Sequence, residues 1–509
     1  MAACVLWSVR AALSATVILA SLVHRTAAQT AAEAPEQTPG QPMVQSPAPG
    51  ETGGEMVLTR DALLASARAR YPEILARLAD QAAAAGRADA AQGAFDLFLE
   101  SEAEGWLTGF YQGTSVANVG VKRRFRDRGG SIYGGYRLAE GLFSVYDDVN
   151  FTNNLGELKV GAVFALMRDR AIDSDRFAVS DLALAEKQAA IEILLTEVGI
   201  QRAALVGYWN WIASGEVVDV FRSLLKRAED RQDALTRQFE QGAVAEIMLL
   251  ENQRVVTNRQ AQLARARQDF AIASNDLSLF WRDAAGGTLV PKPSQRPVSQ
   301  PLSADHFSLA IDTLDMASIG RERFDLQLLA LGVERAQNRI SLAENNLRPQ
   351  LDLNVELSRD FGAIAEGGAS RDSTDFVAGV EFSVPLERTR ARGVQSAARA
   401  ELRAQQIRRR LATEEVELEL RNVLARLSAS YRLYLLAQDE VDLSRQMTEA
   451  EQQLFENGAS DLFRIIFREE DEGRAQIDYI STRRQTLIAR TDFDAATVNL
   501  EALGLARPR

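Results

Sequence analysis

Apolar residues recur at steps of four and three along the proline-free stretch from Leu386 to Arg507. The spacing skips one turn at Gln438 and places one apolar stripe on one side of an α-helix, as is typical of long helices that pack side by side. The stripe consists of Val416, Leu420, Leu424, Leu427, Tyr431, Tyr434 and Val441. A helix from Thr389 to Phe455 would be on the order of 100 Å long, because an α-helix rises about 1.5 Å per residue. The first half of the chain offers a similar run over 173–239.

Four shorter segments alternate apolar and polar residues, which is the period of a strand with one apolar face. The expected strands cover about 93–102, 156–166, 348–358 and 376–386. In the third segment, Leu351, Leu353 and Val355 alternate with Asp352 and Asn354. Alternating runs of this length suit tilted strands that cross a bilayer.

The helical and alternating segments occur twice in the same order, so the chain is expected to be an internal repeat. Each half has a short helix, a strand pair, a long helix, a glycine turn and a second long helix. The turns read Phe-Glu-Gln-Gly-Ala over 239–243 and Phe-Glu-Asn-Gly-Ala over 455–459, with an offset of 216 residues between Gly242 and Gly458. Prolines, which break helix interiors and sheet ladders, mark the joints.

These joints give the expected domain map. It comprises a signal peptide (1–28), a disordered Pro/Ala-rich linker (29–56), a first repeat (57–283, helical hairpin 171–283), a linker (284–320), a second repeat (321–503, helical hairpin 389–503) and a tail (504–509).

The start of the chain has the features of a secretory signal. Arg10 precedes the apolar run Ala11 to Val23, and the small residues of Thr26-Ala27-Ala28 follow. This order of positive, apolar and small residues predicts cleavage near residue 28. An uncleaved membrane anchor is the alternative interpretation. Residues 29–55 are rich in Ala, Pro, Gln, Glu and Gly, which predicts a disordered segment.

The first half carries an insert between its strands, at about 103–155, which is rich in glycine and aromatic residues. Its aromatic residues are Trp106, Phe110, Tyr111, Tyr133, Tyr136, Phe143, Tyr146 and Phe151. The segment from Ser131 to Leu138 is a candidate for a further strand. The insert fits either an aromatic girdle or exterior loop of a membrane barrel or an ordinary globular hairpin with a small core, and both interpretations stay open.

Composition narrows the function classes. Asp plus Glu is 70 against 58 Lys plus Arg, which argues against nucleic acid as a partner. The only cysteine is Cys4 and the histidines are His24 and His306, so a chain processed near residue 28 keeps no cysteine and one histidine. That count excludes cysteine nucleophiles, disulfides and cysteine metal sites. We therefore expect no enzyme and no cofactor, and no paired-carboxylate motif at a strand end supports a carboxylate-based hydrolase.

Two architectures suit helices of this length: a filamentous coiled coil, or a wall of helices around a lumen. The alternating strands favour the wall, because a filament has no use for them. The fold prediction is an α+β membrane protein with long antiparallel helical hairpins forming an α-barrel, and with transmembrane β-barrel strands. The alternative is a coiled-coil periplasmic scaffold without a pore.

Carboxylates follow both turns. They are Glu246 and Glu251 after the first turn, and Glu469, Glu470 and Asp471, with Glu472, after the second. If the turns lie at a pore end, these residues are candidates for a ring that favours cations; an exposed acidic patch is the alternative. Glycines at 199, 207 and 215 predict close helix–helix approach along the first long helix, with tolerated glycines in a marginal helix as the alternative.

At this point the sequence resembles the TolC family of outer-membrane factors over about 57–503. The repeat, the strand pairs and the turns Gln241-Gly242-Ala243 and Asn457-Gly458-Ala459 carry the resemblance, together with three shorter motifs. These are Arg323-Phe324-Asp325-Leu326, Leu347-Arg348-Pro349-Gln350-Leu351 and Val384-Pro385-Leu386. The first half departs from the last motif with Ala165 in place of proline, and Gln241 and Asn457 stand where family members have Val or a similar residue.

The resemblance implies a homotrimer in the outer membrane with a periplasmic extension. Each chain would give four strands to one lipid-embedded barrel and four helical segments to a tunnel. The residues 241–243 and 457–459 would dock a periplasmic adaptor (membrane fusion protein), which joins an inner-membrane pump of RND or ABC type. The implied function is a passive exit duct for efflux or type I secretion of small molecules or polypeptides.

Overall fold

The computed structural model describes residues 57–109, 112–141, 152–303, 307, 316–363 and 373–506. The expected signal peptide (1–28) and linker (29–56) lie outside the described residues, and so does the end of the tail. Six further residues named above also lie outside them: Phe110, Tyr111, Phe143, Tyr146, Phe151 and His306.

The chain forms two compact units, and neither coincides with one of the two expected repeats. The first comprises the described residues of 84–186 and 333–404; the second comprises those of 57–83, 187–332 and 405–506. Each unit therefore draws on both halves of the sequence, because strands and helices of one half pack against those of the other. The two units are described in turn.

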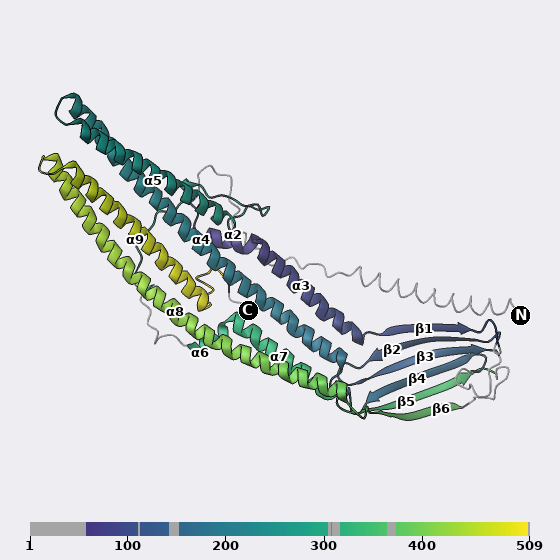
Figure 1. The fold of residues 1–509 in the computed structure, drawn as a ribbon. Helices are drawn as coiled ribbons and strands as arrows, with labels where there is room; N and C mark the ends of the chain where they lie inside the picture. The colour runs from purple at the N-terminus through teal and green to yellow at the C-terminus, as the bar shows by residue number, and fades with distance from the viewer. Residues whose placement is uncertain are drawn as a thin grey trace. The chain divides into compact units, whose positions relative to one another are not determined.

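The elements follow the repeated order expected from the sequence. The first half contains α2 (Arg60–Arg70), α3 (Pro72–Gln92), four strands, α4 (Ser174–Glu240) and α5 (Glu246–Ser278). The second half contains α6 (Met316–Glu322), α7 (Phe324–Asn345), two strands, α8 (Thr389–Glu456) and α9 (Leu462–Ala496). Figure 1 shows α4 and α8 as single long helices, each returning as the shorter α5 or α9.

The first unit holds one antiparallel sheet with the strand order β1-β2-β3-β4-β5-β6 (Figure 1). Its strands are β1 (Phe98–Gly105), β2 (Ser115–Arg124), β3 (Gly130–Glu140), β4 (Gly156–Ala165), β5 (Gln350–Phe361) and β6 (Thr374–Ser383). The expectation of four strands is wrong, because the insert contributes two more. β2 was not expected, and β3 contains the candidate strand from Ser131 to Leu138.

Several expected strand boundaries also shift by a few residues, and two of these shifts have a local cause. The first strand was expected from about residue 93, but Gly93–Phe95 form a 3₁₀ turn and β1 begins at Phe98. The last was expected to continue to residue 386, but β6 ends at Ser383. Pro385 follows two residues later, and proline has no N–H to donate to a ladder.

The strand register gives the sheet one polar and one apolar face. The polar face carries Glu100, Glu102, Lys122, Tyr133, Arg137, Glu157, Lys159, Asp352, Glu356 and Glu381, among others. The apolar face carries Val119, Val121, Ile132, Leu138, Leu158, Val160, Leu353, Leu357, Phe376, Val380 and Phe382. Apolar-face side chains are left exposed by the chain itself, up to 67% at Phe376.

Side chains on the polar face tie neighbouring strands together. Tyr133 of β3 lies over Gly161 of β4, and its hydroxyl donates a hydrogen bond to Glu356 Oε2 of β5 at 2.7 Å. Arg137 forms an ion pair with Glu157 at 2.6 Å, with both side chains almost buried. A side chain at position 161 would collide with the Tyr133 ring. The glycine therefore allows β3 to contact β5 across β4.

The second unit is built around the helical stripes predicted from the sequence. Leu427 is fully buried, Leu420 and Tyr434 are 1% exposed, and Val416, Leu424 and Val441 are also buried. Leu424 and Leu427 pack with Ala489 and Phe493 of α9. The turn skipped at Gln438 is filled by its buried neighbour Ala437. The stripe of α8 is thus confirmed as a packing surface.

A larger core in the same unit joins α2 to α4, α5 and the chain after α9. It includes fully buried Leu63, Trp211, Leu277 and Leu503. The linker between the repeats packs beside the helices here: Arg296 contacts Asp219 of α4, and Tyr434 Oη of α8 accepts a hydrogen bond from the Leu302 N–H at 3.1 Å. The linker therefore connects α4 to α8.

The three glycines of α4 differ in their surroundings. A side-chain carbon at Gly199 would meet nothing within 4 Å, so no close approach occurs there. At Gly207 it would contact Leu277 of α5, as expected for close helix packing. At Gly215 it would collide with Arg296 of the linker rather than with a helix. Close helix–helix approach is thus observed at only one of the three positions.

Within the described ranges, no helix is both long enough and apolar enough to span a membrane.

Gly161 and Gly379 offer a matched test of the polar face, because both lie on it within strands. We expect Gly161→Ala to displace the Tyr133 ring, to weaken its bond to Glu356, and to lower the free energy of unfolding by about 1–3 kcal/mol. Thermal or denaturant unfolding measures the change.

Gly379→Ala is the control, because a side chain there meets nothing within 4 Å. It should leave stability unchanged or raise it, since glycine weakens strands. Equal loss of stability in both variants would contradict a role for the contact between Tyr133 and Gly161.

Candidate functional site: the helical turns and the acidic cluster

The two glycine turns have the same backbone geometry. Gly242 and Gly458 have φ values of 75° and 74°, in the left-handed region that favours glycine. The Gly242 N–H donates to Phe239 O and the Ala243 N–H to Gln238 O, each at 2.8 Å. This pair of bonds is the Schellman motif, which satisfies carbonyls at a helix end.

The second turn repeats these bonds. The Gly458 N–H donates to Phe455 O at 3.0 Å and the Ala459 N–H to Leu454 O at 2.8 Å. The helix before the turn ends at Glu240 in the first turn and at the equivalent Glu456 in the second. The helix after the turn begins at Glu246 and at the equivalent Leu462. The offset of 216 found in the sequence therefore holds through both turns.

Packing brings the segments beside the two turns together. Leu235 of α4, Leu462 and Ile465 of α9 form a buried cluster, and Met248, Leu249 and Phe455 pack against it. The turn residues Gln241, Gly242, Ala243, Asn457, Gly458 and Ala459 are themselves exposed. Equivalent residues just beyond each turn, Ile247 and Phe463, are apolar and yet 60% and 79% exposed.

The acidic candidates do not form one group. Glu246, Glu251 and Glu470 are exposed, and Asp471 is half-buried. Glu251 contacts Arg254 at 3.6 Å and Asp471 contacts Arg474 at 3.9 Å, both within their own helices. Such exposed ion pairs contribute little to stability.

Glu469 fits neither a ring of charge at a pore end nor an exposed acidic patch, because its side chain is buried and ion-paired. Its carboxylate accepts two hydrogen bonds from Arg231 of α4, at 2.8 and 2.9 Å, and one from Arg259 of α5 at 2.8 Å. All three side chains are at most 10% exposed. Glu469 therefore belongs to a buried ion cluster that joins α9 to α4 and α5, and it is not a candidate for an open ring of charge.

Neighbouring polar groups complete this buried ion cluster. Arg231 Nε donates to Asn252 Oδ1 at 2.9 Å, and Arg259 Nη1 donates to Leu224 O at 2.6 Å. One turn further along α9, Glu472 accepts a hydrogen bond from Arg227 at 2.9 Å. That bond, followed by the Glu472 charge, raises the pKa of Arg227. Two consecutive turns of α9 are therefore bound to α4 by ion pairs.

Burial alone would raise the pKa of Glu469, but hydrogen bonds and charges from Arg231 and Arg259 hold it below the ordinary value of 4.5. The carboxylate therefore stays ionised at neutral pH. Its negative charge is required where it lies, because without it two guanidinium groups would share a buried space.

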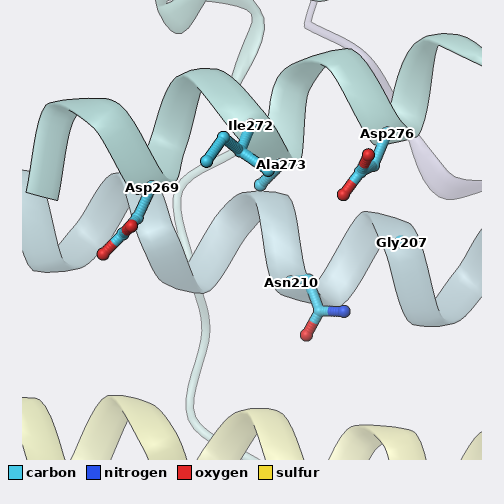
Figure 2. Close-up of a pocket in the computed structure, with 6 residues that line it drawn as sticks. All are labelled: Gly207, Asn210, Asp269, Ile272, Ala273 and Asp276. Carbon is cyan, nitrogen blue, oxygen red and sulfur yellow. The ribbon is translucent and has the colours of Figure 1, made fainter.

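A separate hollow of about 220 Å³ lies between α4 and α5 (Figure 2). Asp269, Ile272 and Asp276 of α5 line it together with Gly207 and Asn210 of α4. Asp269 and Asp276 are exposed. Among the described residues, no group of three or more His, Cys, Asp or Glu side chains is arranged to hold a metal ion.

The partners of Glu469 were not predicted from the sequence. Arg231 and Arg259 lie in stretches of α4 and α5 rich in charged residues, where arginines usually face solvent. Asn252 was missed for the same reason, although it is fully buried and donates to Ala228 O and Gln232 Oε1. The one signal in the sequence that could indicate such a buried polar residue is its position, which continues an apolar stripe of the helix.

Comparison with known proteins supports the resemblance. Residues 318–503 match the family model described as outer membrane efflux protein. No curated protein matches the chain in sequence.

Solved structures match over most of the chain. The outer membrane protein VceC from Vibrio cholerae is 14% identical with a TM-score of 0.59, covering 86% of this chain and 95% of its own. The Campylobacter jejuni CmeC outer membrane channel is 11% identical with a TM-score of 0.58, covering 88% and 90%. The Neisseria gonorrhoeae MtrE outer membrane channel is 14% identical with a TM-score of 0.53, covering 88% and 89%.

The fold is that of the solved outer-membrane channels, and the second half of the chain carries an outer membrane efflux protein domain. The resemblance to the TolC family of outer-membrane efflux proteins is thereby confirmed, and it supports an efflux channel of the outer membrane. The matched family is one of channels rather than enzymes.

Glu469 and Glu470 are adjacent and differ in burial, which makes them a matched pair. We expect Glu469→Gln to lower the free energy of unfolding by about 3–5 kcal/mol, because it leaves buried arginines without their counter-charge. Glu470→Gln should change it by less than about 0.5 kcal/mol. Denaturant unfolding in detergent measures both.

The pH dependence adds a second readout of the same change. The pKa of Glu469 is lower in the folded chain than its ordinary value of 4.5. The stability that its ionised carboxylate contributes is therefore complete above pH 4.5, and it is lost as the pH falls through the lowered pKa of the folded state. Stability of the unmodified chain should therefore fall more steeply below pH 4.5 than that of Glu469→Gln. Parallel acid profiles would contradict the ion cluster.

Proposed function

We propose that this protein is the outer-membrane exit duct of a tripartite efflux system or a type I secretion system. Three copies assemble into one channel, whose sheets form a barrel in the outer membrane and whose helical hairpins form a tunnel in the periplasm. Transport through it is passive, and an inner-membrane pump of RND or ABC type drives export through a periplasmic adaptor. The observation that carries the proposal is the open sheet with one polar and one apolar face.

The sheet supports a place in the membrane. An exposed apolar face that includes Phe376, Val380 and Phe382 suits contact with lipid, and the polar face suits an aqueous lumen. The edge strands β1 and β6 each have one strand neighbour among the described residues. In lipid, only closure of a barrel satisfies the backbone groups of such edges. Pairing with further copies would close it.

The turns support a docking role. They present two copies of the same rigid backbone motif, with exposed apolar residues at equivalent positions after each turn, Ile247 and Phe463. Such a repeated surface suits a partner that binds both turns in the same way. The exposed carboxylates at 246, 251 and 470, with the half-buried Asp471, would then lie near the tunnel entrance and favour cations.

Membrane fractionation combined with native mass measurement tests the function. The protein should sediment with outer membranes and give a mass three times that of the processed chain. Recovery of a soluble monomer would overturn the channel. Deleting residues 348–388 separates the channel from a coiled-coil scaffold, because a scaffold would keep its folding and location without them.

Gly458 tests the docking role. We expect Gly458→Pro to abolish adaptor-dependent export while trimers remain in the membrane, because proline fixes φ near −65° and removes the N–H that bonds to Phe455 O. Drug susceptibility of a strain that carries only the variant, with pull-down of the adaptor, measures the loss.

Gly458→Ala is the matched control. A side chain there meets nothing within 4 Å, so the change costs only about 1–2 kcal/mol of backbone strain, and export should largely persist. Full export by the proline variant would exclude docking at this turn.

A further inference from the structure

The two strands of the insert lie inside the sheet. β2 and β3 stand between β1 and β4, and their pairing is continuous on both sides. β1 and β2 pair from Phe98↔Lys122 to Gly105↔Ser115, and β2 and β3 pair from Ser115↔Glu140 to Arg124↔Ser131. An appended hairpin would leave the β1–β4 pairing intact. Here the hairpin replaces it, so β1 is held in the sheet only through β2 and β3.

Side chains also fix this hairpin to the rest of the sheet. The ion pair between Arg137 and Glu157 joins β3 to β4 where both side chains are largely buried. Tyr133 reaches over Gly161 to Glu356, so β3 is connected to β5 in the second half of the chain. Through these contacts, β3 is bound to both β4 and β5 by side chains as well as by strand pairing with β4.

The added strands preserve the direction and the faces of the sheet. Gly105 ends β1 and Gly156 begins β4, and the register places both on the apolar face. An insertion of two strands leaves β1 antiparallel to β4, as direct pairing would. β1 and β6, the edge strands, therefore also run antiparallel, which lets β1 of one copy pair with β6 of the next.

The sheet is hollowed on its polar side. A hollow of about 570 Å³ is lined mainly by polar-face residues of β1 to β4, including Glu102, Lys122, Tyr133, Arg137 and Lys159. A wall that encloses water must curve toward its polar side, so this hollow suits a lumen rather than a lipid contact.

We propose that β2 and β3 widen the pore. This inference rests on the proposed three-copy channel: six strands from each copy close a barrel of eighteen strands instead of the twelve that four strands per copy would give. Barrel diameter grows roughly linearly with strand number, and barrels of 16–18 strands enclose an open aqueous channel. The outer-membrane ring is then about 1.5-fold wider, and it passes bulky hydrated solutes that a twelve-stranded ring excludes.

Single cysteines in the full-length protein test whether β2 belongs to the membrane wall. In a Cys4→Ser background, we compare Val121→Cys and Lys122→Cys of β2 with Val160→Cys and Lys159→Cys of β4, using a water-soluble maleimide on outer-membrane vesicles. Val121 and Val160 lie on the apolar face and are 40% and 50% exposed in the chain, so only lipid would protect them. The inference expects slow labelling at 121 and 160, and fast labelling at 122 and 159.

Each result has one meaning. Fast labelling at 121 together with slow labelling at 160 would place the hairpin outside the wall, which overturns the inference and leaves the proposed channel standing. Fast labelling at all four positions would overturn the proposed channel itself.

A shortened chain provides the second measurement. Replacing residues 106–155 by Asn-Gly, a two-residue hairpin turn, pairs Gly105 with Gly156 and keeps both faces. Glu104→Arg in the same chain restores a counter-charge for Glu157. Single-particle images in lipid nanodiscs should show a membrane ring whose circumference is about 1.5-fold smaller than that of the unmodified protein. Equal rings would overturn the inference.

Discussion

The long helices depend on burial of their apolar stripes. An isolated helix gains little stability from its own hydrogen bonds, and most helical stability in proteins comes from packing one face. In α8 this face runs through Val416, Leu420, Leu427 and Tyr434, which are almost completely buried. The antiparallel partner that covers such a stripe is available because a left-handed glycine ends the helix and reverses the chain.

Charge is used in two ways in the helical unit. Exposed ion pairs such as Glu251 with Arg254 lie within one helix and keep its surface charged and hydrated. The buried cluster of Glu469 with Arg231 and Arg259 crosses between helices, and its hydrogen bonds fix α9 against both members of the other hairpin. Buried charges tolerate few arrangements, because an unpaired charge is costly away from water. This cluster therefore fixes the register of α9 against α4 and α5 as well as holding the three helices together.

In the sheet, as in the helices, apolar surface has to be covered and polar groups have to be paired. Its polar face holds together through Tyr133, Glu356 and the pair of Arg137 with Glu157. Among the described residues, much of its apolar face is exposed and the edges of β1 and β6 have no further strand beside them. In the proposed channel, lipid would cover this exposed face and strands of further copies would pair with the two open edges. The sheet is thus the part of the molecule on which the proposed place in a membrane depends.

Local patterns in the sequence determined the helical stripe, the repeat, the glycine turns and the existence of strands, because each depends on residues close together in the chain. Strand number was underestimated, since the glycine-rich insert gives β2 little alternation and its place depends on pairing with β1 and β3. The role of Glu469 was also inaccessible, because its partners lie 238 and 210 residues away. Only the tertiary structure decides which distant charges meet and which strands are neighbours, since burial and pairing are properties of the whole fold.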